Sequence, residues 1–231
     1  MGTGLSSTKM GIAMKPQEEK RSDRKHREIM SAATKVFVAK GYDSTSMEEI
    51  ATKAGVSKQT VYKHFADKER LFGEIILATT HQIDEVIGLV AETLGHTKDF
   101  EKDLSQLGRK FLSVLMDAQL LKLRRLVIAN ADRMPQLGRS WYERGFERVL
   151  ATLASCFQRL AQERLLKLVD PLIAANHFVG MLLWIPVNEA MFTGNDRPRS
   201  KAALDGLADA ATRAFIAAYG SKPKSATKAG T

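Results

Sequence analysis

The stretch "GVSKQTVYKHFADKERLF", residues 55–72, decides the fold. A Gly-Val-Ser turn opens it and Asp67 can cap a further helix, so the pattern predicts a helix of about two turns between them. On that helix Val61 and Phe65 lie one turn apart and face inward. Because so short a helix is not stable alone in water, neighbouring helices must hold it by these two side chains.

The other positions of this short helix carry side chains that form hydrogen bonds or bear charge. A displayed helix after a glycine-containing turn is the second element of a helix-turn-helix, which enters the DNA major groove. Glutamine pairs with adenine, lysine donates to guanine or phosphate, and threonine contacts a thymine methyl group. The alternative is a polar helix that only covers a core. The displayed residues are Lys58, Gln59, Thr60, Tyr62, Lys63 and His64.

Two further helices precede this one. Ile29, Val36 and Phe37 belong to an apolar stripe that predicts a helix over 22–40. In "SMEE", Ser46 is the expected N-cap of a short second helix, with a glutamate three residues later as in a capping box.

Several polar groups near these helices can meet phosphate. We expect Ser46 at the start of the second helix and Lys68 at the start of the fourth to bind it, because helix N-termini attract anions. Basic residues ahead of the first helix could follow the DNA backbone or enter a minor groove. These are Arg21, Arg24, Lys25 and Arg27.

The composition of the 231 residues is that of a soluble globular protein, with 44% hydrophobic and 26% charged residues. A formal net charge of +9 indicates a polyanionic partner, either nucleic acid or an anionic membrane surface. The apolar run 178–187 is about half the length that spans a bilayer, so we expect no membrane partner. A single cysteine, Cys156, excludes an intramolecular disulfide framework and fits a cytoplasmic location.

The whole chain is predicted to be all-α, because no segment alternates apolar and polar residues as a strand does. Residues 1–21 form an expected disordered basic tail and 220–231 a second disordered tail. After the short helix, the periodicity predicts helices over 67–94, 99–117, 118–132, 136–167, 170–193 and 201–219.

The segment "GYDSTSMEEIATKAGVSKQTVYKHFADKERLF", residues 41–72, closely resembles the N-terminal DNA-binding region of the TetR family, and residues 123–157 resemble the AefR-type C-terminal region of some members. The resemblance implies an all-α homodimer with a helix-turn-helix DNA-binding domain, here 22–68, and a ligand-binding and dimerisation domain, here 69–219. By position, the implied DNA contacts are Ser46, Lys58, Gln59, Thr60, Tyr62, Lys63, His64 and Lys68. Gln59 stands where many members have a small residue, so base preference is not transferred.

Large or soft residues among a few polar ones mark the expected effector pocket in the second domain. The alternative for each is ordinary core, which is the more common role of Met and aromatic side chains at helical spacing. The two last helices are apolar on several sides and must be buried by more than one neighbour. The resemblance implies a four-helix bundle with a second copy, which we favour over a monomer core because a helix-turn-helix usually reads two half-sites. The pocket candidates are Phe111, Met116, Trp141, Phe157, His177, Met181, Trp184 and Asn188.

We therefore expect a sequence-specific transcriptional repressor, a homodimer that a small apolar effector releases from a near-palindromic operator. A non-specific architectural DNA-binding protein is the alternative, and a helical enzyme or interaction domain is another. The histidines show no metal-ligand spacing, and no nucleophile elbow or phosphate loop is present. We therefore expect no enzyme activity, no cofactor and no metal.

Overall fold

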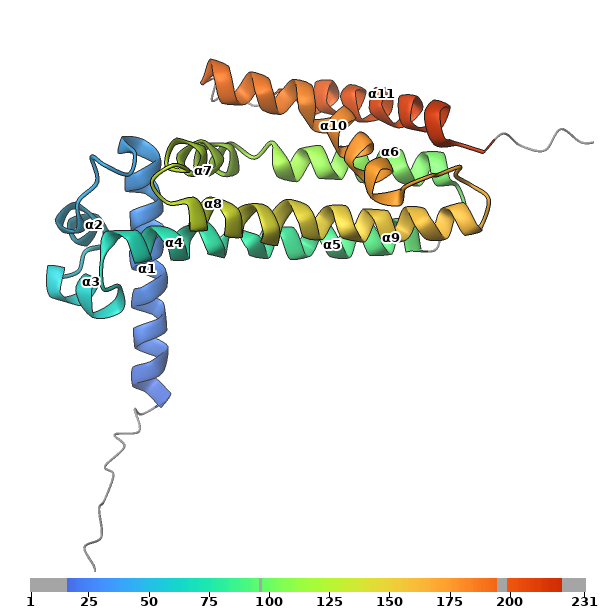
Figure 1. Ribbon diagram of the computed structural model, residues 1–231. Coiled ribbons are helices and arrows are strands. Elements are labelled where there is room, and N and C mark those ends of the chain that lie inside the picture. The colour runs from blue at the N-terminus through green and yellow to red at the C-terminus, as the bar shows by residue number, and fades with distance from the viewer. Residues whose placement is uncertain (1–15, 96, 195–198, 222–231) are drawn as a thin grey trace, which may run out of the picture. The chain divides into compact units, whose positions relative to one another are not determined.

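The computed structural model describes residues 16–95, 97–194 and 199–221. The chain divides into two compact units, residues 1–72 and 73–231, and the helices of each are shown in Figure 1. The first unit contains α1 (Pro16–Lys40), α2 (Met47–Ala54), α3 (Lys58–His64) and the start of α4 (Lys68–Ala78). The second contains the end of α4, then α5 (Thr80–Gly95), α6 (Phe100–Leu115), α7 (Ala118–Ala129), α8 (Pro135–Tyr142), a π-helical turn η1 (Glu143–Glu147), α9 (Arg148–Gln162), α10 (Pro171–Thr193) and α11 (Lys201–Tyr219).

The core of the first unit is aromatic at one end. Phe37 of α1 stacks on Tyr42 with ring centroids 5.8 Å apart, and Phe72 of α4 meets the Phe37 ring edge-on at 5.0 Å. Ile29 of α1 and Ile50 of α2 are fully buried in the same core, which confirms the predicted apolar stripe. Removing these side chains from water stabilises the three-helix head, because each contributes about 1.5–3 kcal/mol.

Side-chain caps set the ends of the short helices, as the sequence predicts. The Ser46 Oγ accepts a hydrogen bond from the backbone N–H of Glu49 at 3.1 Å, and Ser57 Oγ caps α3 by accepting from Thr60 N at 3.1 Å. Between these helices Gly55 adopts φ +66°, a left-handed conformation that glycine takes without strain. The Glu49 carboxylate pairs with Lys40 at 2.6 Å, so it links α2 to the end of α1.

The second unit has its own core, in which α6 packs on α11 and α9 packs on both α5 and α10. Phe157 of α9, Phe178 of α10 and Phe215 of α11 form an aromatic cluster with centroids 5.0–6.1 Å apart. Gly108 lets α6 approach its neighbours, because a Cβ there would lie 3.2 Å from Leu182 and 3.4 Å from Ala208.

Three helix boundaries differ most from the sequence prediction. Helix α1 begins at Pro16, six residues before the predicted start. The predicted helix 67–94 is two helices, because Thr79 bonds the Ile76 carbonyl through both its N–H and its hydroxyl and ends α4. The predicted helix 136–167 ends at Gln162, since Arg164 adopts φ +61°.

Residues 220 and 221, predicted to belong to a disordered tail, are hydrogen-bonded to the rest of the second unit. The backbone of Lys167 donates to Tyr219 O at 2.7 Å, and Ser221 N donates to Leu165 O at 3.0 Å. These bonds order residues 220 and 221. The rest of the predicted tails, residues 1–15 and 222–231, lies outside the described residues.

Helix α10 has a large exposed apolar surface. Its 23 residues contain an 18-residue window with a mean hydropathy of 1.2, which by length and composition alone could cross a membrane, and 39% of that window is buried within the protein. The buried side includes Phe178, Leu182 and Pro186. Its exposed large side chains are Leu172, Ile173, Met181, Trp184, Ile185 and Phe192.

Candidate functional site

Helix α3 presents most of its surface to solvent. Val61 and Phe65 are both 0% exposed, which confirms that these two side chains pin the helix. Lys58, Gln59 and Lys63 are exposed. Tyr62 is also exposed, and the Lys58 ammonium lies 5.8 Å from the centroid of its ring.

The cation of Lys58 already has a partner within the head. It forms an ion pair with Glu48 of α2, and both side chains are exposed. The hydrogen bond between them lowers the pKa of Glu48 and raises the pKa of Lys58, so both remain ionised at neutral pH. A DNA group that binds Lys58 must therefore compete with an adjacent carboxylate.

Two other residues of α3 have polar neighbours. The hydroxyl groups of Thr60 and Ser57 share a hydrogen bond of 2.8 Å. His64 is half-buried beside His26 of α1, with ring centroids 5.9 Å apart. Burial lowers the pKa of His64, and the nearby charges of His26, Lys63 and Lys25 lower it further. His64 is therefore a neutral imidazole at pH 7 in the unbound protein.

The structure gives Lys68 a different environment from the expected phosphate site. Its ammonium donates to the carbonyls of Tyr42 and Thr45, both at 2.9 Å, and to that of Asp43 at 3.4 Å. These oxygens belong to the turn that joins α1 to α2. The charge expected to bind phosphate is thus directed at protein acceptors.

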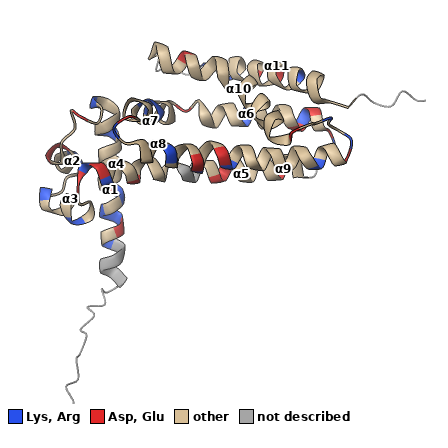
Figure 2. Cartoon of the chain, viewed as in Figure 1, with Lys and Arg blue, Asp and Glu red and all other residues tan. Residues whose placement is uncertain are grey.

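Basic residues recur along α1 and on α3 (Figure 2). Arg21, Arg24 and Arg27 are exposed and lie within α1, not ahead of it as expected. Arg24 forms an i,i+4 pair with Glu28 at 3.6 Å. An exposed pair of this length is weak, and it leaves α1 available for contacts with a polyanion.

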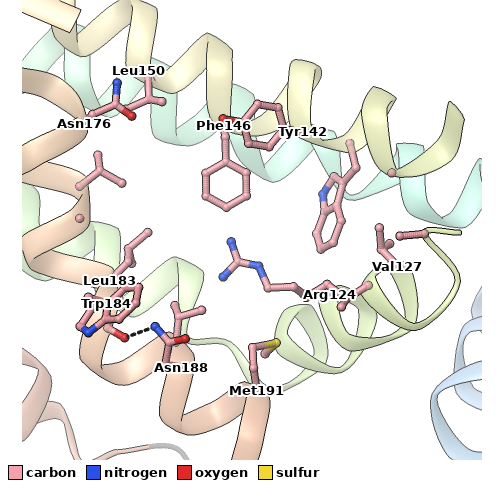
Figure 3. Close-up of a pocket in the computed structure, with 17 residues that line it drawn as sticks. Arg124, Val127, Tyr142, Phe146, Leu150, Asn176, Leu183, Trp184, Asn188 and Met191 are labelled. Atoms are coloured by element: carbon pink, nitrogen blue, oxygen red, sulfur yellow. Dashed lines mark hydrogen bonds between the residues drawn. The ribbon is translucent and has the colours of Figure 1, made fainter. Parts of the chain in front are cut away.

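The second unit contains a cavity of about 660 Å³, a size that suits a small organic ligand. Residues of α7, α8, η1, α9 and α10 line it. The lining is mainly apolar and includes Val127, Phe146, Leu183 and Met191 (Figure 3). A much smaller cavity of about 30 Å³ shares Phe146 and several other lining residues with it.

The structure brings half of the predicted pocket residues to these cavities. Trp141, Trp184 and Asn188 line the large cavity, and Phe111 and Trp141 line the small one. Met116 is buried and lines neither, and Phe157 belongs to the aromatic core cluster.

Two predicted pocket residues lie elsewhere on α10. His177 is exposed and hydrogen-bonded through Nδ1 to the Tyr219 hydroxyl, so the partner of this polar residue is protein. Met181 is 38% exposed and lines neither cavity. Both the cavity side and the exposed side of α10 carry apolar residues, so apolar composition alone did not show which residues line the cavity.

Sequence reasoning missed Arg124 of α7, which lines both cavities. Its guanidinium lies 4.8 Å from the centroid of the Phe146 ring. A signal was present, because Arg124 stands three residues before Val127 and four after Leu120, within a buried apolar stripe. A charged residue on such a stripe faces the interior.

Comparisons with known proteins agree with this geometry. The family described as "Bacterial regulatory proteins, tetR family" matches residues 29–75, and "AefR-like transcriptional repressor, C-terminal domain" matches residues 102–221. The crystal structure of a TetR-family transcriptional regulator from Mesorhizobium loti is 62% identical, with a TM-score of 0.79, and the match covers 87% of this chain and 98% of that chain. The chain therefore belongs to the TetR family of transcriptional regulators, with an N-terminal helix-turn-helix DNA-binding domain and a helical C-terminal domain.

More distant relatives differ in their described roles. The flavonoid-responsive regulator FrrA is 27% identical, with a TM-score of 0.67 over 88% of this chain and 100% of that chain. The HTH-type transcriptional activator FasR of Mycolicibacterium smegmatis is 34% identical over 84 residues, which are 36% of this chain and 35% of FasR. The chain thus matches about a third of the length of that curated relative.

Proposed function

We propose that this chain is a homodimeric repressor that binds a near-palindromic operator and leaves it when a small apolar effector enters the cavity. Residues 22–68 bind DNA, and residues 69–219 bind the effector and the second copy. The observation that carries the proposal is the display of α3, which Val61 and Phe65 hold by two fully buried side chains. A helix held in this way offers its polar face to a major groove.

The proposed DNA contacts divide by chemistry. Gln59 is exposed and can form paired hydrogen bonds to adenine, so it is the proposed base reader. Thr60 and His64 are half-buried. Their proposed place is next to the bases that Gln59 contacts. Phosphate contacts are assigned to Ser46, Tyr62 and Lys63, which are exposed, and to Lys58 after it leaves Glu48.

Dimerisation is assigned to α10 and α11. The exposed apolar side chains of α10 include Ile173, Ile185 and Phe192, and α10 contains no lysine or arginine. An apolar face of this kind marks an interaction site, and a second copy of the same face would cover it about a two-fold axis. Two heads related in that way read two half-sites of a palindrome.

The effector part of the proposal rests on the cavity. Its apolar lining with two tryptophans suits an apolar or aromatic molecule, and the relative FrrA is described as flavonoid-responsive. Repression is favoured because the matching C-terminal family is described as a repressor domain, whereas FasR is described as an activator. An effector releases DNA only if it binds the DNA-free conformation more tightly.

Footprinting on the DNA that flanks the gene tests the proposal. We expect one protected near-palindrome, bound at least ~10³-fold more tightly than unrelated duplex. Equal affinity for all duplexes would support the architectural alternative. A reporter fused to the protected promoter then shows whether the protein represses or activates transcription, because loss of a repressor raises transcription.

A further inference from the structure

The cavity of the second unit contains one cationic side chain. Arg124 runs from α7 into the space that Phe146, Trp184 and Met191 border (Figure 3). The rest of the described lining is apolar apart from Tyr142, two asparagines and one threonine of the adjoining small cavity, and it includes no aspartate or glutamate. The guanidinium contacts the face of the Phe146 ring at 4.8 Å.

Other half-buried arginines of the described residues have oxygen acceptors. Arg125, the next residue, donates to Ala190 O at 2.7 Å. Arg159 pairs with Glu163 at 2.9 Å, and Arg199 pairs with Glu189. Arg124 differs from all three, because an aromatic ring is its partner among the described residues and a ring accepts no directed N–H···O bond.

The position of Arg124 restricts what can fill the cavity. Arginine keeps its proton in proteins, so it cannot avoid the cost of burial by becoming neutral. Water in an open cavity can solvate the guanidinium, but a ligand that occupies the space removes that water. A neutral apolar ligand would leave a desolvated charge unpaired, whereas a ligand with an anionic oxygen would replace the lost hydrogen bonds.

We propose that the ligand of this cavity carries one ionised acidic oxygen group, a carboxylate or phenolate, on an apolar body, and that this group pairs with the guanidinium of Arg124. The inference deepens the proposed function by naming the chemical class of its effector. The planar fork of arginine donates two parallel hydrogen bonds to a carboxylate and one or two to a phenolate.

The two asparagines favour this orientation of the ligand. Asn188 Nδ2 donates to Trp184 O at 2.7 Å, and Asn176 Nδ2 donates to Leu172 O at 2.9 Å. Each amide thus uses one of its two N–H donors on its own helix and keeps its oxygen and its second N–H. These neutral groups suit a hydroxyl or carbonyl group of the ligand, whereas Arg124 is the cationic group of the lining that can pair with an anion.

Ligand binding by the full-length protein without DNA tests this inference. The two tryptophans of the chain, Trp141 and Trp184, both line the cavity, so intrinsic fluorescence reports on this site. The probes are matched pairs: dodecanoate with dodecanamide, 2-naphthoate with 2-naphthamide, and 7-hydroxyflavone above its pKa with 7-methoxyflavone. Calorimetry on the same pairs gives affinities that do not depend on probe absorbance.

We expect an acid of at least one pair to bind about ten-fold or more tightly than its neutral partner. Arg124→Gln should remove that preference and leave the affinity for the neutral partner unchanged or improved. Arg139→Gln, which removes an exposed arginine of α8 outside the cavity, should keep the preference. If only the carboxylate pairs or only the flavone pair shows the preference for the acid, that result identifies which kind of acid the site takes.

Three results would overturn the inference: no acid binds the wild type, the neutral partners bind equally well, or Arg124→Gln keeps the preference. The wild-type comparison stands even if the variant does not fold. If acids are preferred but the footprint persists in their presence, the effector-release proposal fails and the assignment of Arg124 stands. If only neutral molecules release the protein from DNA, the effector-release proposal stands and the assignment of Arg124 fails.

Discussion

The Lys68 ammonium donates a hydrogen bond to the carbonyl of Tyr42 at 2.9 Å and lies 4.4 Å from the centroid of that residue's ring. One side chain at the start of α4 therefore holds the turn between α1 and α2 by a charged hydrogen bond and a cation–π contact. A bond to the Thr45 carbonyl adds to this. A residue expected from sequence to bind phosphate thus acts within the protein as a brace.

Lys68→Met tests that role. Because charge-assisted hydrogen bonds contribute about 1.5–3 kcal/mol, we expect the variant to lower the free energy of unfolding by roughly that amount, as measured by urea denaturation. The salt dependence of DNA binding should not change. A decrease of about one in the slope of log K against log salt, with unchanged stability, would instead assign Lys68 to a phosphate.

Glu48→Gln tests the ion pair with Lys58. The change frees the Lys58 ammonium and removes a negative charge beside the proposed DNA face, so affinity for every duplex should rise about two- to ten-fold at low salt. Mobility shift or fluorescence anisotropy measures it. Glu101→Gln, an exposed acid of the second unit, gives the same change in net charge and should have a much smaller effect.

Gln59→Ala tests base reading. If Gln59 pairs with adenine, the variant should lose about 1–3 kcal/mol on the operator and lose discrimination at one position of each half-site. Binding to operators with single base changes measures this. Lys63→Ala is the contrast, since loss of a phosphate contact weakens all sequences alike. Unchanged preference in Gln59→Ala would exclude it as a base reader.

The pH dependence of DNA binding tests His64. Burial and nearby cations lower the pKa of His64 in the unbound head, and DNA phosphates would raise it again. Binding therefore takes up a proton, and affinity should rise about two- to five-fold as the pH falls from neutrality to about 5.5. His64→Gln should remove the part of this dependence that His64 causes, whereas His177→Gln should not.

Stability has the opposite dependence on the same residue. Unfolded histidine binds protons that folded His64 does not, so the free energy of unfolding falls as the pH decreases below about 6.5 and levels off below the folded pKa. Urea denaturation of the wild type and of His64→Gln measures the difference. Equal pH profiles would show that His64 titrates normally.

Ile185→Asp tests the dimer interface on α10. Ile185 is 51% exposed and lines neither cavity, so a carboxylate there should not disturb the effector site. Burying that charge against a second copy is costly, and we expect the variant to sediment as a monomer and to bind a half-site only weakly. Val169→Asp changes a residue that is fully exposed outside the helices and should leave the dimer intact.

How far the sequence predicted the site depended on distance along the chain. The outward face of α3 follows from helical periodicity and from caps three residues apart, so it could be predicted locally. The partners of Lys68 are 23 to 26 residues away, and no spacing rule relates them. Half of the predicted pocket residues missed the cavities: His177 and Met181 lie on the exposed side of α10, and Met116 and Phe157 are buried in the core, because cavity, core and exposed positions share the same residue types.

By itself, the sequence determined the helical class, the three-helix head and the short helix pinned at Val61 and Phe65. These features depend on side chains three or four positions apart and on capping groups, interactions that a local segment already contains. Only the tertiary structure decided the surroundings of the charged side chains. Lys58 pairs with Glu48, Lys68 binds the turn that contains Tyr42, and Arg124 lies in an apolar cavity. The physical reason is that the environment of an ionic group comes from every helix packed around it, and most of those helices are distant in sequence.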